Sequence, residues 1–141
     1  MSVITAKNYN NNLNFNTMGL LNTILGNASQ VNINEIKAQF EHVLVENENI
    51  EAAFSLFRDK MVFTNKRIIF LDKQNVTGSK KEYLSVPYHA VSVFSVESAG
   101  TFDADAEIKL WVKELGQITK KVGKSTDTMQ IQKILASYIL K

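Results

Sequence analysis

Between residues 50 and 122 the chain carries seven short apolar segments, each separated from the next by a polar turn. Alternation of apolar and polar side chains is typical of a strand with one face on a core. In the clearest segment, Ile108, Leu110 and Val112 lie on one face and Trp111 points to the other. The pattern therefore predicts seven antiparallel strands. They are expected at about 50–57, 61–63, 68–71, 81–86, 90–96, 107–112 and 117–122.

Helical patterns precede and follow the strands. Apolar residues from Met18 to Leu25 fit a short amphipathic helix that ends at Gly26. A second helix is predicted to begin with Asn32 as its N-cap, and its apolar face includes Phe40. A final helix at about 127–140 has Asp127 as its cap. Its apolar stripe is Ile131, Ile134, Leu135 and Tyr138.

The length and composition describe one globular domain. The chain has 141 residues, of which 45% are hydrophobic, and it has no cysteine. Disulfides and thiolate metal sites are thereby excluded, and the composition is compatible with the cytoplasm, where we expect the protein. The formal charge of +2 is too balanced for a dedicated nucleic-acid binder. Residues 8–16 hold six asparagines, so we interpret residues 1–17 as an N-terminal arm.

Several stretches carry a resemblance to a known family. They are Asp59–Arg67, Asp72–Gln74 with Gly78, Tyr83–Tyr88, Phe94–Asp103 and Leu110–Val112. On these residues the chain from about residue 18 onward resembles the bacterial pleckstrin-homology (PH) domain family. A run as long as Glu97 to Asp103 is a specific signal. The asparagine-rich arm lies outside the family pattern, and Asn75 stands where family members commonly have glycine.

The resemblance implies a fold that agrees with the strand and helix pattern. The expected class is α+β, mainly β: a PH-like, bent, seven-stranded antiparallel barrel capped by a C-terminal helix, with two N-terminal helices. The domain then covers residues 18–141, with helices in 18–44, the barrel at about 50–123 and the last helix at about 127–140. The resemblance also implies homo-oligomers, in the form of rings, without an accepted catalytic role or an established ligand.

Self-association is the leading functional prediction. A barrel and its C-terminal helix form a closed core, so the apolar stripes of the N-terminal helices and an outward-facing tryptophan need another surface. The alternative is that the helices dock on their own chain. The predicted contact residues between subunits are Leu20, Leu21, Ile24, Phe40 and Trp111. The function predicted from them is a non-enzymatic homo-oligomeric binding or scaffold module, for which another protein is a further candidate partner.

A second prediction concerns anions. Lys60, Lys66 and Arg67 come from neighbouring turns and form a candidate anion-binding set. The alternative function is therefore a peripheral membrane adaptor that binds anionic lipid headgroups. A solvated turn surface is the simpler interpretation, with Arg67 paired to a carboxylate such as Asp72 or Glu97.

No catalytic constellation is visible in the sequence, and we predict no enzyme, no cofactor and no metal. His42 and His89 are the only histidines, and neither has the spacing of a metal or nucleophile motif. Asp103, Asp105 and Glu107 alternate along one segment, but they lack the rest of a calcium loop. Lys109, Trp111 and Lys113 are the only basic and aromatic trio, and a subunit contact explains it better than nucleic acid does.

Overall fold

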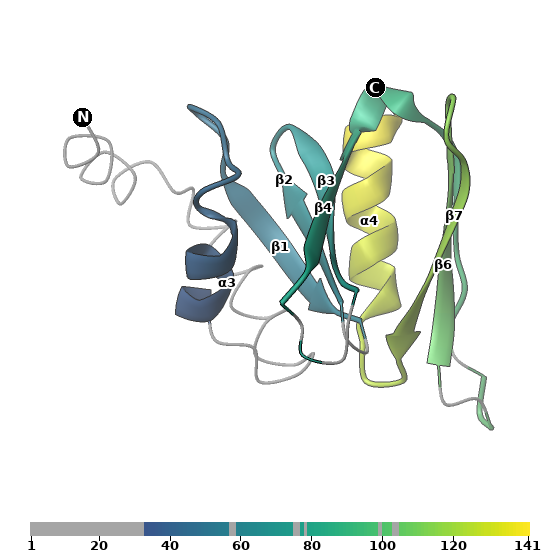
Figure 1. Ribbon diagram of the computed structural model, residues 1–141. Helices are drawn as coiled ribbons and strands as arrows, with labels where there is room; N and C mark the ends of the chain where they lie inside the picture. Colours follow the sequence, from purple (N-terminus) through teal and green to yellow (C-terminus); the bar gives the residue numbers. More distant parts are fainter. Residues whose placement is uncertain (1–32, 57–58, 75–76, 78, 99, 103–104) are drawn as a thin grey trace.

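The computed structural model describes residues 33–56, 59–74, 77, 79–98, 100–102 and 105–141 (Figure 1). The asparagine-rich arm and the segment 18–32 lie outside the described residues, and so do the predicted contact residues Leu20, Leu21 and Ile24. Of the two helices expected in residues 18–44, the described chain contains one, which is shorter than predicted and ends at Phe40.

The described elements follow the predicted order, with strands between helices. They are α3 (Ile33–Phe40), β1 (Ile50–Ser55), β2 (Lys60–Thr64), β3 (Arg67–Lys73), β4 (Lys81–Pro87), a 3-10 helix η1 (Tyr88–Ala90), β5 (Val91–Val96), β6 (Asp105–Val112), β7 (Gly116–Gly123) and α4 (Thr128–Ile139). All seven predicted strands are present. Pro87 is the last residue of β4, an edge strand, which is a position where the missing N–H of proline costs no ladder bond.

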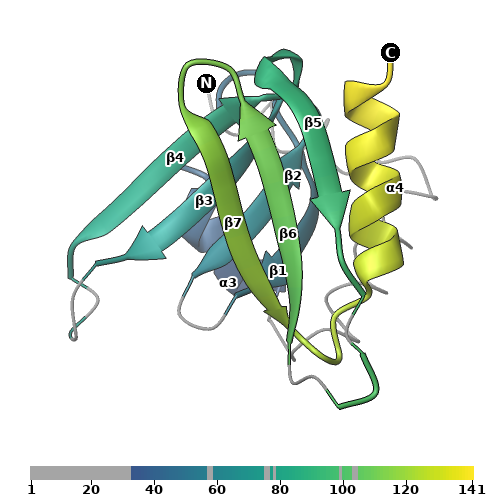
Figure 2. The same ribbon diagram turned by 90° about the vertical axis from the view of Figure 1, so that its right-hand side faces the viewer.

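The strands form two antiparallel sheets and not a closed barrel. The first sheet has the order β1-β2-β3-β4, and the second has the order β5-β6-β7. Within the described chain, one isolated bridge between Leu56 and Val122 joins the end of β1 to β7. The prediction of a closed barrel is therefore wrong, because the ladder of hydrogen bonds does not continue around the structure. Figure 2 shows the second sheet in front of the first, with α4 running alongside β5.

The C-terminal helix fills the space between the sheets as its sequence predicts. The carboxylate of Asp127 accepts a hydrogen bond from the Gln130 N–H at 3.1 Å, which is the predicted N-cap. The predicted stripe lies on the main core, with Ile131, Ile134 and Leu135 buried and Tyr138 packed at its edge. Inward-facing residues of both sheets complete this core, among them Phe54, Met61, Phe63, Ile68, Phe70, Ile108 and Leu110.

A second core lies on the other face of the first sheet, where α3 covers it. Ile36 and Phe40 of the helix pack on Val62 and Ile69 of the central strands, together with Ala53 and Leu71. Both faces of the central strands are thus covered, which is why β2 and β3 are buried almost without alternation. Phe40 is 0% exposed, so the structure corrects its assignment as a subunit contact and places it in the core of its own chain.

The docking of α3 makes Phe40 a stability residue. We expect Phe40→Ala to lower the free energy of unfolding by about 3–5 kcal/mol, because it removes a fully buried ring and leaves a cavity. Urea denaturation followed by circular dichroism measures the change, and Glu41→Ala, at the exposed neighbouring position, is the control. A loss below about 0.5 kcal/mol, the range of ordinary surface changes, would contradict the docked position of α3.

Candidate functional site

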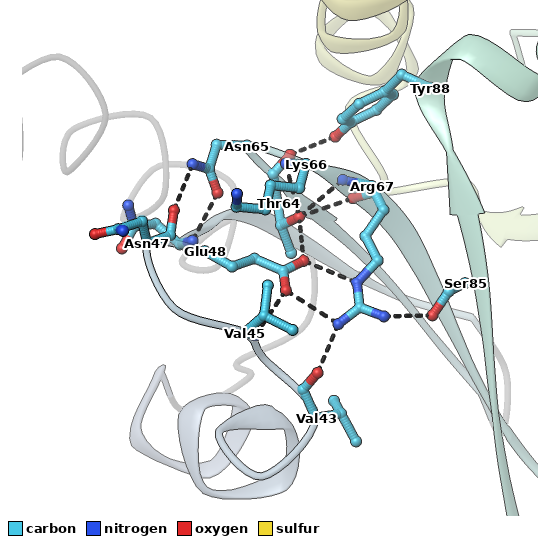
Figure 3. Close-up of polar contacts among 11 residues, drawn as sticks. Val43, Val45, Asn47, Glu48, Thr64, Asn65, Lys66, Arg67, Ser85 and Tyr88 are labelled. Carbon is cyan, nitrogen blue, oxygen red and sulfur yellow. Dashed lines mark hydrogen bonds and ion pairs between the residues drawn. The ribbon is translucent and has the colours of Figure 1, made fainter. Parts of the chain in front are cut away.

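Arg67, one of the three predicted anion-binding residues, is fully engaged by its own chain (Figure 3). Its Nε donates to Glu48 Oε1 at 2.8 Å, and its Nη2 donates to Glu48 Oε2 at 3.0 Å. Further bonds run to Ser85 Oγ at 2.7 Å and to the carbonyl of Val43. The partner of Arg67 is thus Glu48, and the expectation of Asp72 or Glu97 is wrong. A guanidinium with four such bonds has little capacity left for an external anion.

Glu48 is buried, with 1% of its surface exposed, and its hydrogen bonds favour the ionised form of its carboxyl. Besides Arg67, it accepts from Thr64 Oγ1 at 2.8 Å and from the Val45 N–H at 3.0 Å. Burial by itself raises the pKa of the carboxyl. The hydrogen bonds from Arg67, Val45 and Thr64, together with the charge of Arg67, outweigh burial and hold the pKa below its ordinary value.

Lys66 lies in the tight turn beside this ion pair and is exposed. The side chain of Asn65 fixes the turn, since its oxygen accepts from the Asn49 N–H at 2.7 Å and its amide donates to the Asn47 carbonyl at 2.9 Å. The Lys66 N–H donates to Thr64 Oγ1 at 3.0 Å. Asn47 has a positive φ of 61°, a conformation that asparagine tolerates better than most residues.

The same network continues to the C-terminal helix. Tyr88 donates to the Thr64 carbonyl at 2.6 Å, and its ring stacks on that of Tyr138 at a centroid distance of 4.4 Å. Tyr138 in turn donates to the carboxylate of Glu51. Burial, followed by the neighbouring phenol of Tyr138 and then by the carboxylates of Glu51 and Glu48, raises the pKa of Tyr88. Burial and the bond to Glu51 do the same for the pKa of Tyr138, so both phenols remain protonated donors at physiological pH.

Lys60, the third predicted residue, lies at the opposite end of β2 from this network. The strand from Lys60 to Thr64 spans about 13 Å, so the structure does not bring Lys60 together with Lys66. Lys60 instead neighbours Lys73 and Lys81, which face each other as a cross-strand pair of β3 and β4. We call Lys60, Lys73 and Lys81 the lysine cluster. The sequence alone could not bring Lys73 and Lys81 together with Lys60, because their meeting depends on the register of β3 and β4.

The lysine cluster concentrates positive charge. Burial, and then the charges of Lys73 and Lys81, lower the pKa of Lys60, while Glu35 on α3 acts in the opposite direction. Like charges directly opposite each other on a sheet are destabilising. Among the residues that the structure describes, no carboxylate lies within 4.0 Å of any of the three ammonium groups. The cluster is therefore a candidate anion site.

Trp111 lies on the outer face of the second sheet, as predicted. Its cross-strand neighbour on β5 is Val93, which is 55% exposed, and Leu115 in the β6–β7 turn is also 55% exposed. Trp111 itself is half-buried. In Figures 1 and 2 no described helix or strand lies over this face. We call Val93 and Trp111 the outer patch.

The comparisons with known proteins agree on the family. Residues 19–139 match the family described as Bacterial PH domain. This chain is a bacterial PH domain. It is 46% identical to "Uncharacterized protein YjqA" of Bacillus subtilis (strain 168), over 85% of this chain and 98% of that protein.

Two crystal structures from Shewanella are similar to this bacterial PH domain. The pleckstrin homology domain from Shewanella amazonensis is 44% identical with a TM-score of 0.70, covering 85% of this chain and 98% of the other. The DUF1696 family protein from Shewanella loihica is 45% identical with a TM-score of 0.68, covering 77% and 94%. The PH-like fold of two sheets and a C-terminal helix is thereby established.

The remaining candidate residues of this PH domain do not come together. His42 contacts the ring of Tyr83 at a centroid distance of 5.4 Å, and His89 is exposed in η1. Asp105 and Glu107 pair with Lys121 and Lys109, at 3.4 and 3.0 Å, and Asp103 lies outside the described residues. In the described part of the chain, no group of three or more metal-binding side chains is found. None of its helices is long and apolar enough to cross a membrane.

The ion pair makes a stability prediction for Glu48. We expect Glu48→Gln to lower the free energy of unfolding at pH 7 by about 3 kcal/mol, because it leaves the guanidinium of Arg67 without its counter-charge. Glu46→Gln, an exposed position in the same loop, is the control. Urea denaturation measures both variants.

The same residue predicts a pH dependence. Since the folded protein lowers the pKa of Glu48, its stabilisation is complete above the ordinary value of 4.5 and is lost as pH falls through the folded value. The difference in stability between the native protein and Glu48→Gln should shrink as the pH is lowered below 4.5. A difference that stays constant with pH would contradict the ionised, paired state of Glu48.

Proposed function

We propose that this bacterial PH domain is a non-enzymatic binding or scaffold module that works as a homo-oligomer. The observation that carries the proposal is the outer patch, where Val93 and Trp111 form an apolar pair on a sheet face that no described element covers. Tryptophan is enriched at the energetic centres of protein interfaces. Membership of the bacterial PH domain family suggests a non-catalytic domain, and this supports the non-enzymatic part of the proposal.

The two sheets differ in how much surface they leave for a partner. The first sheet has the main core on one face and α3 on the other, and the fold itself buries Phe40. The second sheet is covered on one face only: the inward residues of β6 are buried, and its outward residues are half-buried along the whole strand. We therefore place the subunit contact on the second sheet. We propose Leu20, Leu21 and Ile24, which belong to the undescribed segment, as additional contact residues.

The mass of the full chain in solution tests this proposal. We expect size-exclusion chromatography with light scattering, at micromolar concentration, to give a mass of several subunits. Trp111→Lys and Val93→Lys should each shift the mass toward that of a monomer, because a charge would be buried in the contact. Leu140→Ser removes an exposed apolar side chain outside the outer patch, near the C-terminus, and is the control. A native protein that stays monomeric would contradict the proposal.

A second candidate function is binding of an anionic lipid headgroup, and the lysine cluster favours it. Its three lysines come from β2, β3 and β4, the charges of Lys73 and Lys81 act on Lys60, and the described residues supply no ion pair for the three ammonium groups. A phosphate would relieve their mutual repulsion and make charge-assisted hydrogen bonds. In this version of the membrane-adaptor hypothesis, Lys73 and Lys81 replace Lys66 and Arg67.

Vesicle binding tests the second candidate. The native protein should sediment with vesicles that contain phosphatidylserine and should remain in solution with neutral phosphatidylcholine vesicles. Substituting Lys60, Lys73 and Lys81 together by glutamine should abolish sedimentation, because each cation near the surface contributes about 1 kcal/mol. Lys66→Gln, at the other end of β2, is the matched control. Equal recovery with the two kinds of vesicle would rule out this function.

A further inference from the structure

β4 is the outermost strand of the first sheet, and its outer edge is uncovered. In Figure 2 no described helix or strand lies beyond it. Other outer strands differ, because β5 lies alongside α4 and the end of β1 meets β7 at the bridge between Leu56 and Val122. An edge strand presents unpaired backbone N–H and C=O groups, with which another chain can pair. The outer edge of β4 is therefore a candidate surface for binding an extended segment.

The register of the first sheet identifies the backbone groups of β4 that point outward. The Gln74 N–H donates to the Lys80 carbonyl at 3.0 Å, so these two residues form a hydrogen-bonded pair of the ladder between β3 and β4. Hydrogen-bonded and non-hydrogen-bonded pairs alternate along an antiparallel ladder. The residues of β4 whose N–H and C=O groups then point outward are Lys81, Tyr83 and Ser85. Within the described chain, these outward groups have no hydrogen-bond partner.

The two ends of this edge are protected against indiscriminate pairing, and its centre is not. Pro87 has no N–H, and Lys81 carries a charge, which are two features that keep edge strands from aggregating. Residues 83–85 between them are uncharged. The strand is fixed at this point, because the Tyr83 hydroxyl donates to the Gln39 carbonyl of α3 at 3.2 Å. A short partner strand therefore meets an edge that is already ordered, which lowers the entropic cost of binding.

The lysine cluster adjoins one end of the same edge. Lys81 is the first residue of β4, and Lys73 faces it across the pair of β3 and β4. Side chains two residues apart on a strand share a face, so these lysines lie on the same face as Leu71 and Tyr83. Leu71 and Tyr83 belong to the core beneath α3. The positive charge is therefore on the face of the first sheet that α3 covers.

The carboxylates near this end leave the cluster without an ion pair. Asp72 and Glu82 form the adjacent cross-strand pair, so their side chains point to the opposite face of the sheet. Glu35 acts on the cluster from α3, and Asp59 accepts a hydrogen bond from the Lys73 N–H at 3.3 Å. Within the described chain, none of these four carboxylates forms an ion pair with a lysine of the cluster. An anionic group of a partner can therefore bind there.

The direction of a partner strand decides which of its groups reaches the lysines. In an antiparallel pair the two chains run in opposite directions, so the carboxyl end of the partner lies at the beginning of β4. Lys81 is at that position, and Lys73 lies one strand further in. A terminal carboxylate placed there accepts charge-assisted hydrogen bonds, which are stronger than those between neutral groups.

We propose that the outer edge of β4 binds the extended C-terminal segment of a partner protein, with the terminal carboxylate at Lys73 and Lys81. The outward backbone groups of β4 supply the main-chain hydrogen bonds. A β-branched or aromatic residue of the partner suits the position opposite Tyr83. This contact rests on the binding role proposed above and does not require the homo-oligomer. It gives the lysine cluster a carboxylate in place of a lipid phosphate, because a headgroup alone leaves the adjoining edge unused.

Fluorescence anisotropy with the full chain tests the recognition of the carboxylate. The probe is an eight-residue peptide of alternating threonine and valine, labelled at its N-terminus and ending in a free carboxylate. It should bind. The same peptide with an amidated C-terminus should bind at least about tenfold more weakly, because it loses the charge-assisted contact.

N-methylated versions of the same peptide test the pairing with β4 and leave the protein unchanged. Only every second N–H of a paired strand points to its neighbour. Methylation at one set of alternate residues should therefore abolish binding, and methylation at the other set should not.

Lysine variants test where the carboxylate lies. Substituting Lys73 and Lys81 together by glutamine should remove the preference for the free carboxylate, so that the free and amidated peptides bind equally. Lys66→Gln, in the turn at the other end of β2, is the matched control and should keep the preference of the native protein. Thermal unfolding followed by circular dichroism verifies that both variants are folded.

Several results would overturn the proposed contact. Equal binding of the free and amidated peptides to the native protein excludes recognition of the carboxylate, and equal effects of N-methylation at every residue exclude strand pairing. If the protein sediments with phosphatidylserine vesicles but does not bind the peptide, the lysine cluster is a lipid site. If the peptide lowers the mass of a native homo-oligomer in light scattering, the edge of β4 is a contact between subunits. A native monomer that binds the peptide as expected contradicts the homo-oligomer alone and supports this contact.

Discussion

The ion pair between buried Glu48 and partly buried Arg67 joins parts of the chain that do not pair through strands alone. Arg67 begins β3, Glu48 lies in the connection from α3 to β1, and Ser85 belongs to β4. Removing two charges from water is costly, and the cost is offset here because hydrogen bonds surround both partners. The pair therefore fixes the connection that follows α3, and with it the helix that covers the first sheet.

The position of α3 creates the difference between the two sheets. With α3 in place, the central strands of the first sheet are enclosed on both faces, and they become the most buried part of the molecule. The second sheet keeps an open face, where alternation along β6 remains visible as half-buried and buried positions. The first sheet thus forms the buried centre of the fold, and the second sheet keeps one face accessible to a partner. The chain of bonds from Thr64 through Tyr88 and Tyr138 to Glu51 connects the ion pair with the C-terminal helix.

Local patterns in the sequence were sufficient for the elements of the fold. Short apolar segments between polar turns located all seven strands, with clear period-two alternation only towards the later ones, and Asp127 marked the start of α4. Whether the strands close into a barrel was not predictable in this way, because closure depends on which strand edges meet. Among the described residues, the two sheets are hydrogen-bonded to each other only at the bridge between Leu56 and Val122. The apolar stripe with Phe40 was identified correctly as a stripe. Its cover could not be read from the sequence, since a stripe does not specify whether its own chain or another one buries it.

The candidate sites depended on contacts that are distant in sequence, and there the predictions were weaker. Arg67 and Glu48 are 19 residues apart, and no periodicity links them. The lysine cluster likewise forms only once the register of β3 and β4 sets Lys73 opposite Lys81. Trp111 was the exception, because its outward direction follows from alternation within one strand.

Trp111 is the single tryptophan of the chain, and it lies half-buried at the surface of the second sheet. Indole emission responds to the polarity of its surroundings, whereas the tyrosines contribute a separate band. The protein consequently carries an intrinsic chromophore at one defined position of its surface. Whatever covers or uncovers that face changes the wavelength of its fluorescence, without any label attached to the chain.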